Sequence, residues 1–301
     1  MVTRRLRESY VRVSISRILR VSVFFARNTI DVNFMSDVNK FRFNRIYYLN
    51  ADEENSAHID LYQTINVNSI YHTESKISVE YHWVNSKKDL REALRKIENE
   101  VDNGFYPLIH IACHGNEIGL RLPSKAKVKW YELSNYLLNI NLKTRNNLFV
   151  AFACCDGAYI SLQMIDRFTG SMKSQRTPIF GYVGIIGEIR WGEVEKGYSK
   201  FYEELFRSFS TGDMDLDNAI SNLDRNTSNP LQCISCIQLF KRVIEGILAQ
   251  EALSFKSNLA LDSRVSSILR SYFRNKGVLP NFQNFHKMRS ALLNQELYIH
   301  F

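Results

Sequence analysis

Two short apolar runs near the middle of the chain stand out in its pattern of hydrophobic and polar positions. The first covers residues 107–113 and leads into His114-Gly115, and the second covers residues 148–153 and leads into Cys154. Continuous apolar runs of this length, bounded by glycine, are typical of strands that are buried on both faces of a parallel sheet. A helical pattern over residues 130–140 separates the two runs, so this part of the chain predicts a strand–helix–strand unit.

The two strands of such a unit end close together. A right-handed crossover places their C-terminal ends at one edge of the sheet, which is where open α/β sheets carry their sites. His114 leaves the first strand and Cys154 leaves the second. We therefore expect these two side chains to meet.

The segments on either side repeat the alternation of strands and helices. Strand patterns occur at residues 41–49, 77–83 and 177–184, and helical patterns occur at residues 90–101, 159–168 and 194–209. Ser86 and Asp89 form a capping start for the first of these helices. The alternation predicts an α/β fold with a mostly parallel sheet flanked by helices.

Two segments give weaker patterns. Residues 51–75 are polar and predict no more than a short helix over residues 59–64, although the polar break at Asn50-Ala51-Asp52 falls at the same sheet edge as the predicted site. From residue 229 onward the apolar spacing is helical, with one helix running through Ile234 and two more at residues 265–273 and 286–293. We therefore divide the chain into a basic arm (1–35), an α/β domain (36–228) and a helical C-terminal subdomain (229–301).

Composition changes this picture mainly at the N-terminus. The 301 residues are 45% hydrophobic and 23% charged, which is ordinary for a globular protein. No apolar run reaches the roughly 18 residues that a transmembrane helix requires. The formal net charge is +8, but residues 1–35 carry seven arginines against two acidic residues, which leaves +3 for the rest of the chain. We therefore expect no nucleic acid to bind the α/β domain.

The arm itself has two interpretations. Its composition is rich in arginine and serine and poor in acidic residues, which is typical of a transit peptide. It also fits an appended or poorly ordered segment, and we favour this second interpretation.

The cysteines indicate free thiols. Five cysteines in a chain of this length, without a clear signal peptide, favour a reducing, cytoplasmic compartment over a disulfide framework. The side chains at positions 113, 114, 154 and 155 do not predict a zinc site, because adjacent residues of a strand point to opposite faces. Cys233 and Cys236 form a CxxC motif without a second pair and suit buried small residues. We expect no metal and no cofactor.

A histidine beside a cysteine has a specific chemical use. A thiol near neutral pH is mostly protonated, and a nearby imidazole raises the thiolate fraction and carries protons. Gly115 allows close approach of the backbone to a substrate, and its N–H and that of the cysteine can face a developing oxyanion. A single histidine at a strand end is more often structural, but His114 with Gly115 and a downstream cysteine favours a catalytic dyad.

These motifs, in this order, resemble the caspase-like (clan CD) cysteine peptidases, and among them most closely the CHAT domain family. The resemblance rests on His114-Gly115 after one strand and on Ala153-Cys154-x-x-Gly157 after the next, and it covers roughly residues 105–225. It implies the caspase-like (caspase–hemoglobinase) fold. It also implies that His114 and Cys154 are catalytic and that Gly115 belongs to the oxyanion hole.

The resemblance implies a function as well. It predicts an endopeptidase that cleaves a protein substrate through a thioester intermediate and requires no cofactor. Such an enzyme is expected to stay latent until a regulatory protein or a ligand activates it, and relatives of this kind often act in prokaryotic antiviral defence or cell death. The linker at residues 169–177 corresponds to the segment where caspases are processed, and it carries Lys173 and Arg176.

Two assignments within the site stay open. Cys154 has a glycine three residues later, as in CHAT peptidases, whereas Cys155 has a glycine two residues later, as in the caspase signature. We favour Cys154 as the nucleophile. Asp156 either selects a basic substrate residue or forms the turn before Gly157, and Glu188 and Trp191 are further candidates for a substrate pocket.

Two other functions compete with a peptidase. The first is a non-catalytic interaction module that keeps the caspase-like fold. The second is a binder of nucleic acid or of a membrane surface through the basic arm at residues 1–35.

Overall fold

The computed structural model describes residues 42–52, 56–74, 76–169, 177–210, 216–229, 231–235 and 239. The basic arm, the linker with Lys173 and Arg176, and the helices predicted at residues 265–273 and 286–293 lie outside the described residues. All statements below refer to the described part of the chain.

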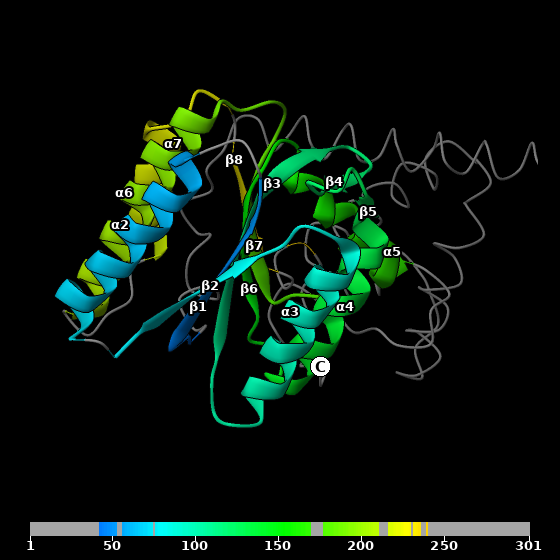
Figure 1. The fold of residues 1–301 in the computed structure, drawn as a ribbon, viewed down its shortest axis with the longest axis horizontal. Coiled ribbons are helices and arrows are strands. Elements are labelled where there is room, and N and C mark those ends of the chain that lie inside the picture. Colours follow the sequence, from blue (N-terminus) through cyan, green and yellow to red (C-terminus); the bar gives the residue numbers. More distant parts are fainter. Residues whose placement is uncertain are drawn as a thin grey trace, which may run out of the picture. The chain divides into compact units, whose positions relative to one another are not determined.

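A mostly parallel sheet forms the centre of the described part of the chain (Figure 1). Its strand order is β2-β1-β3-β6-β7-β8; β7 and β8 pair antiparallel, and the other neighbours pair parallel. The strands are β1 (Arg45–Ala51), β2 (Ser78–Trp83), β3 (Pro107–Asn116), β6 (Phe149–Ala153), β7 (Gly181–Ile185) and β8 (Leu231–Ser235). The end of β3 continues into a small antiparallel extension made by β4 (Gly119–Arg121) and β5 (Lys127–Lys129).

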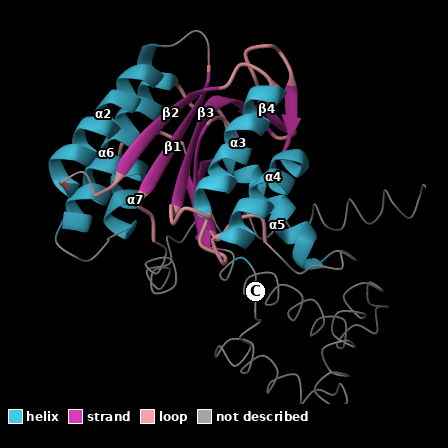
Figure 2. Ribbon diagram, turned by 60° about the horizontal axis from the view of Figure 1, so that its bottom comes forward, coloured by secondary structure: helices cyan, strands magenta, loops and turns pink. Residues whose placement is uncertain are grey.

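Helices cover both faces of the sheet (Figures 1 and 2). One layer holds α3 (Lys87–Val101), α4 (Trp130–Lys143) and α5 (Ile160–Thr169), and the other holds α2 (Ser56–Thr73), α6 (Trp191–Ser210) and α7 (Leu216–Arg225). A short 3-10 turn, η3 (Gly157–Tyr159), precedes α5. The predicted α/β fold with a mostly parallel sheet flanked by helices is confirmed.

Local sequence explains several of these elements. All five residues of β6 are buried, as a continuous apolar run predicts for a central strand. The α3 helix begins with the predicted capping box, in which Ser86 accepts the N–H of Asp89 and the Asp89 carboxylate accepts the N–H of Ser86. Its buried stripe of Leu90, Leu94 and Ile97 faces the core.

Two elements differ from the sequence prediction. The α2 helix spans 18 residues instead of the predicted 59–64. Its apolar residues lie on both the buried side (Leu61 and Ile65) and the exposed side (Val67 and Ile70), so no single apolar stripe marks the helix in the sequence.

The second difference concerns the chain after residue 228. A helix was predicted through Ile234, but residues 231–235 form strand β8, so this prediction is wrong at its start. Pairing with β7 decides the conformation, because a short apolar run fits a strand or a helix equally well by periodicity. The sheet therefore extends past the boundary that was placed at residue 228.

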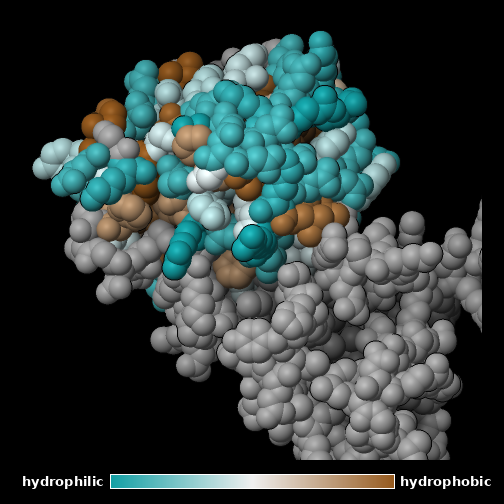
Figure 3. All heavy atoms as spheres, turned by 90° about the horizontal axis from the view of Figure 1, so that it is seen from below, coloured by the Kyte–Doolittle hydropathy of each residue, from teal (hydrophilic) through white to brown (hydrophobic). Residues whose placement is uncertain are grey.

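None of the described helices is both long enough and apolar enough to cross a bilayer. The face in Figure 3 is mostly hydrophilic where it is described, with hydrophobic residues in small groups.

Candidate active site

The predicted site residues follow the ends of three neighbouring parallel strands. The last paired residues of β3 and β6 are Ala112 and Ala153, and the last pair of β1 and β3 is Ala51 with Cys113. His114 and Cys154 therefore leave the sheet at the same edge. Asp52 leaves β1 at this edge as well.

Gly115 brings the histidine segment against the cysteine. A Cβ atom at position 115 would lie 3.2 Å from Cys154 Sγ and would collide with the carbonyl oxygen of Cys155. Gly157 approaches Cys154 from the other side, since a Cβ atom there would lie 3.3 Å from the same Sγ. The thiol of Cys154 is thus enclosed by two glycines that leave no room for a side chain.

His114 lies at the surface end of the site. Its side chain is 51% exposed, and its Nε2 lies 3.7 Å from Asp52 Oδ1. Its ring packs edge-on against Trp191, with the ring centroids 5.4 Å apart. The predicted pocket residue Trp191 therefore lies beside the predicted base.

Asp52 is a site residue that the sequence did not single out. Its side chain is only 2% exposed, so the carboxylate is almost fully removed from water. Buried carboxylates require compensating charge or hydrogen bonds. Oδ1 faces His114, and Oδ2 lies 3.4 Å from Nε2 of His58, a buried residue of α2. The polar break after the first strand was the only sequence signal for this residue.

The two cysteines differ in exposure. Cys154 is fully buried. A hydrogen bond with Cys113, followed by burial, raises the pKa of the Cys154 thiol well above its ordinary value. Cys155 is half-buried and accepts the backbone N–H of Ile189 at 3.4 Å. Burial also raises the pKa of Cys155, and the Ile189 N–H opposes that rise.

Asp156 joins two loops of the site. It adopts a left-handed conformation with φ of 56°, and its Oδ1 accepts the N–H of Gly187 at 3.0 Å. Its own N–H donates to the carbonyl of Gly187, also at 3.0 Å. These bonds match the turn-forming role that was one of the two predicted for it.

The acidic groups near this loop also interact with one another. Burial raises the pKa of the Asp156 carboxyl, and the charges of Glu117 and Glu188 add to the rise. Glu188 itself is exposed. The mouth of the site is therefore acidic on the side of the two cysteines.

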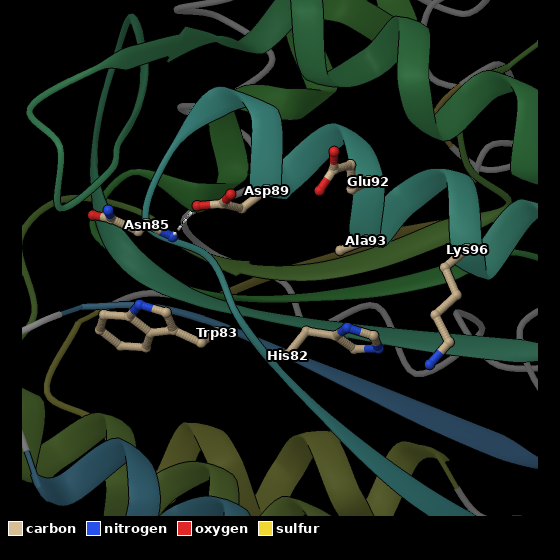
Figure 4. A pocket seen from close by; sticks show the side chains of 7 residues that line it. All are labelled: His82, Trp83, Asn85, Asp89, Glu92, Ala93 and Lys96. Carbon is tan, nitrogen blue, oxygen red and sulfur yellow. Dashed lines mark hydrogen bonds between the residues drawn. The ribbon is translucent and has the colours of Figure 1, made fainter.

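A groove of about 570 Å³ lies elsewhere, between β2 and α3 (Figure 4). His82 and Trp83 line it from the strand side, and Asp89, Glu92 and Lys96 line it from the helix. Three of its polar side chains have partners within the chain: Asp89 caps α3, and His82 and Lys96 both contact Glu80. The groove contains none of the predicted site residues.

Comparisons with known proteins do not assign the chain to a family. No family model matches it, and no curated protein matches it. Within the described ranges, no three His, Cys, Asp or Glu side chains are grouped so as to hold a metal ion.

The crowding at Gly115 leads to a first prediction. Gly115→Ala should destabilise the fold by about 1–3 kcal/mol, because the added methyl group meets the Cys155 carbonyl, which cannot rotate away. Thermal and urea unfolding measure the effect. Gly192→Ala is the matched control, since no atom lies within 4 Å of its Cβ position and alanine favours the α6 helix. Equal stability of the two variants would contradict the close packing at Gly115.

Proposed function

We propose that this protein is a caspase-like cysteine endopeptidase, with the caspase-like fold and a site of the CHAT type. The observation that carries the proposal is the meeting of two sequence motifs at one sheet edge. His114-Gly115 and Ala153-Cys154-x-x-Gly157 leave adjacent parallel strands, and Gly115 lies directly against the thiol of Cys154. A buried carboxylate, Asp52, faces the histidine at 3.7 Å.

In the proposed reaction Cys154 is the nucleophile and His114 moves the proton. The sulfur bonds to the carbonyl carbon of the substrate, and the thiol proton passes to the imidazole. The imidazole then gives this proton to the leaving amine as the C–N bond breaks, which leaves a thioester. Water attacks the thioester with His114 as the base, the acid product leaves, and the thiol of Cys154 takes back a proton.

The surrounding groups have separate roles in this proposal. The backbone N–H groups of Gly115 and of the cysteine hold the oxyanion that forms on the carbonyl oxygen. Asp52 orients the imidazole and stabilises its protonated form. No step requires a metal or an organic cofactor.

The described conformation supports a latent enzyme. Cys154 is fully buried, and a hydrogen bond with Cys113, followed by burial, raises the pKa of its thiol. A thiol in this state is a poor nucleophile, because the thiolate is the reactive form. Activation would require rotation of the Cys154 side chain toward the substrate, and binding of a regulatory protein or ligand would supply it.

The acidic mouth supports a basic substrate residue. Asp156 and Glu188 lie near the cysteines, and their carboxylates would attract Arg or Lys before the cleaved bond. The bonds between Asp156 and Gly187 hold the Asp156 carboxylate in one place.

Covalent labelling tests the proposal. The protein is incubated with fluorogenic peptides that end in Arg, Lys or Asp and with the matching peptidyl chloromethyl ketones, and the labelled cysteine is mapped by mass spectrometry. We expect a label on Cys154 and a preference for basic peptides. A label on Cys155 would move the nucleophile by one residue, and hydrolysis without any labelled thiol would exclude the mechanism.

The burial of Cys154 also favours a second function, a non-catalytic interaction module with the same fold. In that case the enclosed thiol is a packing residue, as buried cysteines commonly are. Well-folded protein that neither cleaves peptides nor takes up the label, even with candidate activators present, would favour this second function.

The contact between the two thiols leads to a second prediction. Cys113→Ala should speed alkylation of Cys154 by iodoacetamide several-fold, because the hydrogen bond that raises its pKa is lost. Peptide mapping after timed alkylation measures the rate at each cysteine. Cys233→Ala, which removes a cysteine from β8, is the control and should leave the rate at Cys154 unchanged. An unchanged rate in Cys113→Ala would mean that the thiol contact does not restrain Cys154.

A further inference from the structure

His58 occupies a position behind the proposed dyad. It lies in the first turn of α2 and is only 1% exposed. Its Nε2 faces Asp52 Oδ2 at 3.4 Å, and its Nδ1 lies 3.3 Å from the hydroxyl of Tyr48. Its ring meets Trp191 edge-on, with the centroids 4.3 Å apart.

These contacts place the Asp52 carboxylate between two imidazoles. His114 faces Oδ1 from the exposed side, and His58 faces Oδ2 from the interior. An ionised carboxylate only accepts hydrogen bonds, so His58 must present an N–H at Nε2. The Tyr48 hydroxyl can then donate to Nδ1, which sets the orientation of the ring.

Trp191 contacts both imidazoles. Its ring lies against His58 on one side of the carboxylate and against His114 on the other. The indole thus limits the rotation of both rings, and Tyr48 is itself held by stacking on the buried His110 at 4.6 Å. The position of His114 therefore depends on residues from β1, α2 and α6.

We propose that His58 is a positioning residue for the dyad: it holds the Asp52 carboxylate so that Oδ1 stays available to His114. This inference rests on the proposed peptidase function. Without the His58 imidazole, Oδ2 would lose its contact with Nε2 at 3.4 Å, and the buried carboxylate would turn. His114 would then lose its orienting group.

Two substitutions separate the polar contact between His58 and Asp52 from the packing of the ring. His58→Phe keeps a ring against Trp191 but removes the donor, and His58→Gln keeps an N–H near the position of Nε2. We expect His58→Phe to lower kcat by about 10- to 100-fold with an unchanged KM. Losses of this size are typical when a side chain that orients a metal-binding histidine is removed, and His58 would orient His114 in a similar indirect way. His58→Gln should restore most of the activity that His58→Phe loses. Its pH–rate profile should lie closer to that of the wild-type protein than the profile of His58→Phe does.

His72 supplies the matched control. It is half-buried in the last turn of α2, at the opposite end of the helix from His58, and its ring lies against Tyr71. His72→Phe and His72→Gln should leave kcat and the pH–rate profile unchanged. If His58→Phe behaves like His72→Phe, or if His58→Gln is as impaired as His58→Phe, the positioning role is refuted.

A second readout does not depend on activity. In the Cys154→Ala protein, labelled with ¹⁵N-histidine, the imidazole nitrogen signals of His114 should shift in His58→Phe and stay in place in His72→Phe. Unchanged His114 signals in a folded His58→Phe protein would overturn the inference. Absence of peptidase activity in the wild-type protein, with candidate activators present, would instead count against the proposed function, while the NMR comparison would still decide whether His58 positions His114 through Asp52.

Discussion

Cys154→Ala and His114→Ala should each lower kcat for peptide cleavage at least about a thousandfold, because each removes a group that acts directly in bond breaking in the proposed reaction. Cys155→Ala should keep most of the activity. Its thiol is turned to the backbone of Ile189 and not to the glycine after His114. Initial rates with the preferred fluorogenic peptide measure these effects.

The comparison of the two cysteines decides the nucleophile. The two cysteines are adjacent in sequence, and both thiols have raised pKa values. Inactivation by a general thiol reagent would therefore not show which of them is the nucleophile. Thermal unfolding of all three variants controls for folding, since Cys154 is buried and its replacement alters packing. A thousandfold loss in Cys155→Ala with retained activity in Cys154→Ala would reverse the assignment.

Asp52→Asn should lower kcat about 100-fold with little change in KM, less than the roughly 10⁴-fold loss for the aspartate of a serine protease triad. The amide keeps the shape of the carboxylate but loses its negative charge. The protonated form of His114 is then less stabilised during the reaction. We expect a smaller loss of kcat than in the serine protease triad, because Asp52 and His114 are 3.7 Å apart and His114 is half exposed.

Asp60→Asn is the matched control for this substitution. Asp60 lies on the exposed side of α2, two residues from His58. Its substitution by asparagine removes the same negative charge, but from the surface. Its kcat should equal that of the wild-type protein. An Asp52→Asn enzyme with unchanged kcat would show that the buried carboxylate supports the fold and not the reaction.

These predictions share one structural feature: a series of buried polar side chains lies on the interior side of His114. Asp52, His58 and Tyr48 lie in the interior, and His110 continues the series with its Nδ1 3.0 Å from the hydroxyl of Tyr202. Burial lowers the pKa of His110 well below its ordinary value, and His58 adds to the effect. A neutral His110 can stack on Tyr48 without introducing a charge into the core.

Much of the fold was predictable from local sequence. Apolar runs predicted β3 and β6, because strands buried on both faces are mostly apolar. The capping box and single apolar stripe predicted α3, because these signals are complete within one helix. The full length of α2 and the strand β8 were not predicted, since the first lacks a segregated apolar face and the second depends on pairing with β7.

The candidate site, like the fold, was predictable only in part. The sequence by itself predicted that His114-Gly115 and Cys154 leave two adjacent strands at one edge, because strands joined through a helix are usually parallel and such connections are nearly always right-handed. Only the tertiary structure decided that Asp52 and Trp191 contact His114, that His58 lies against both of them, and that the Cys154 thiol is turned inward to Cys113. These contacts depend on strand register, helix packing and side-chain rotamers. Such quantities arise between segments far apart in the chain, so no local pattern encodes them.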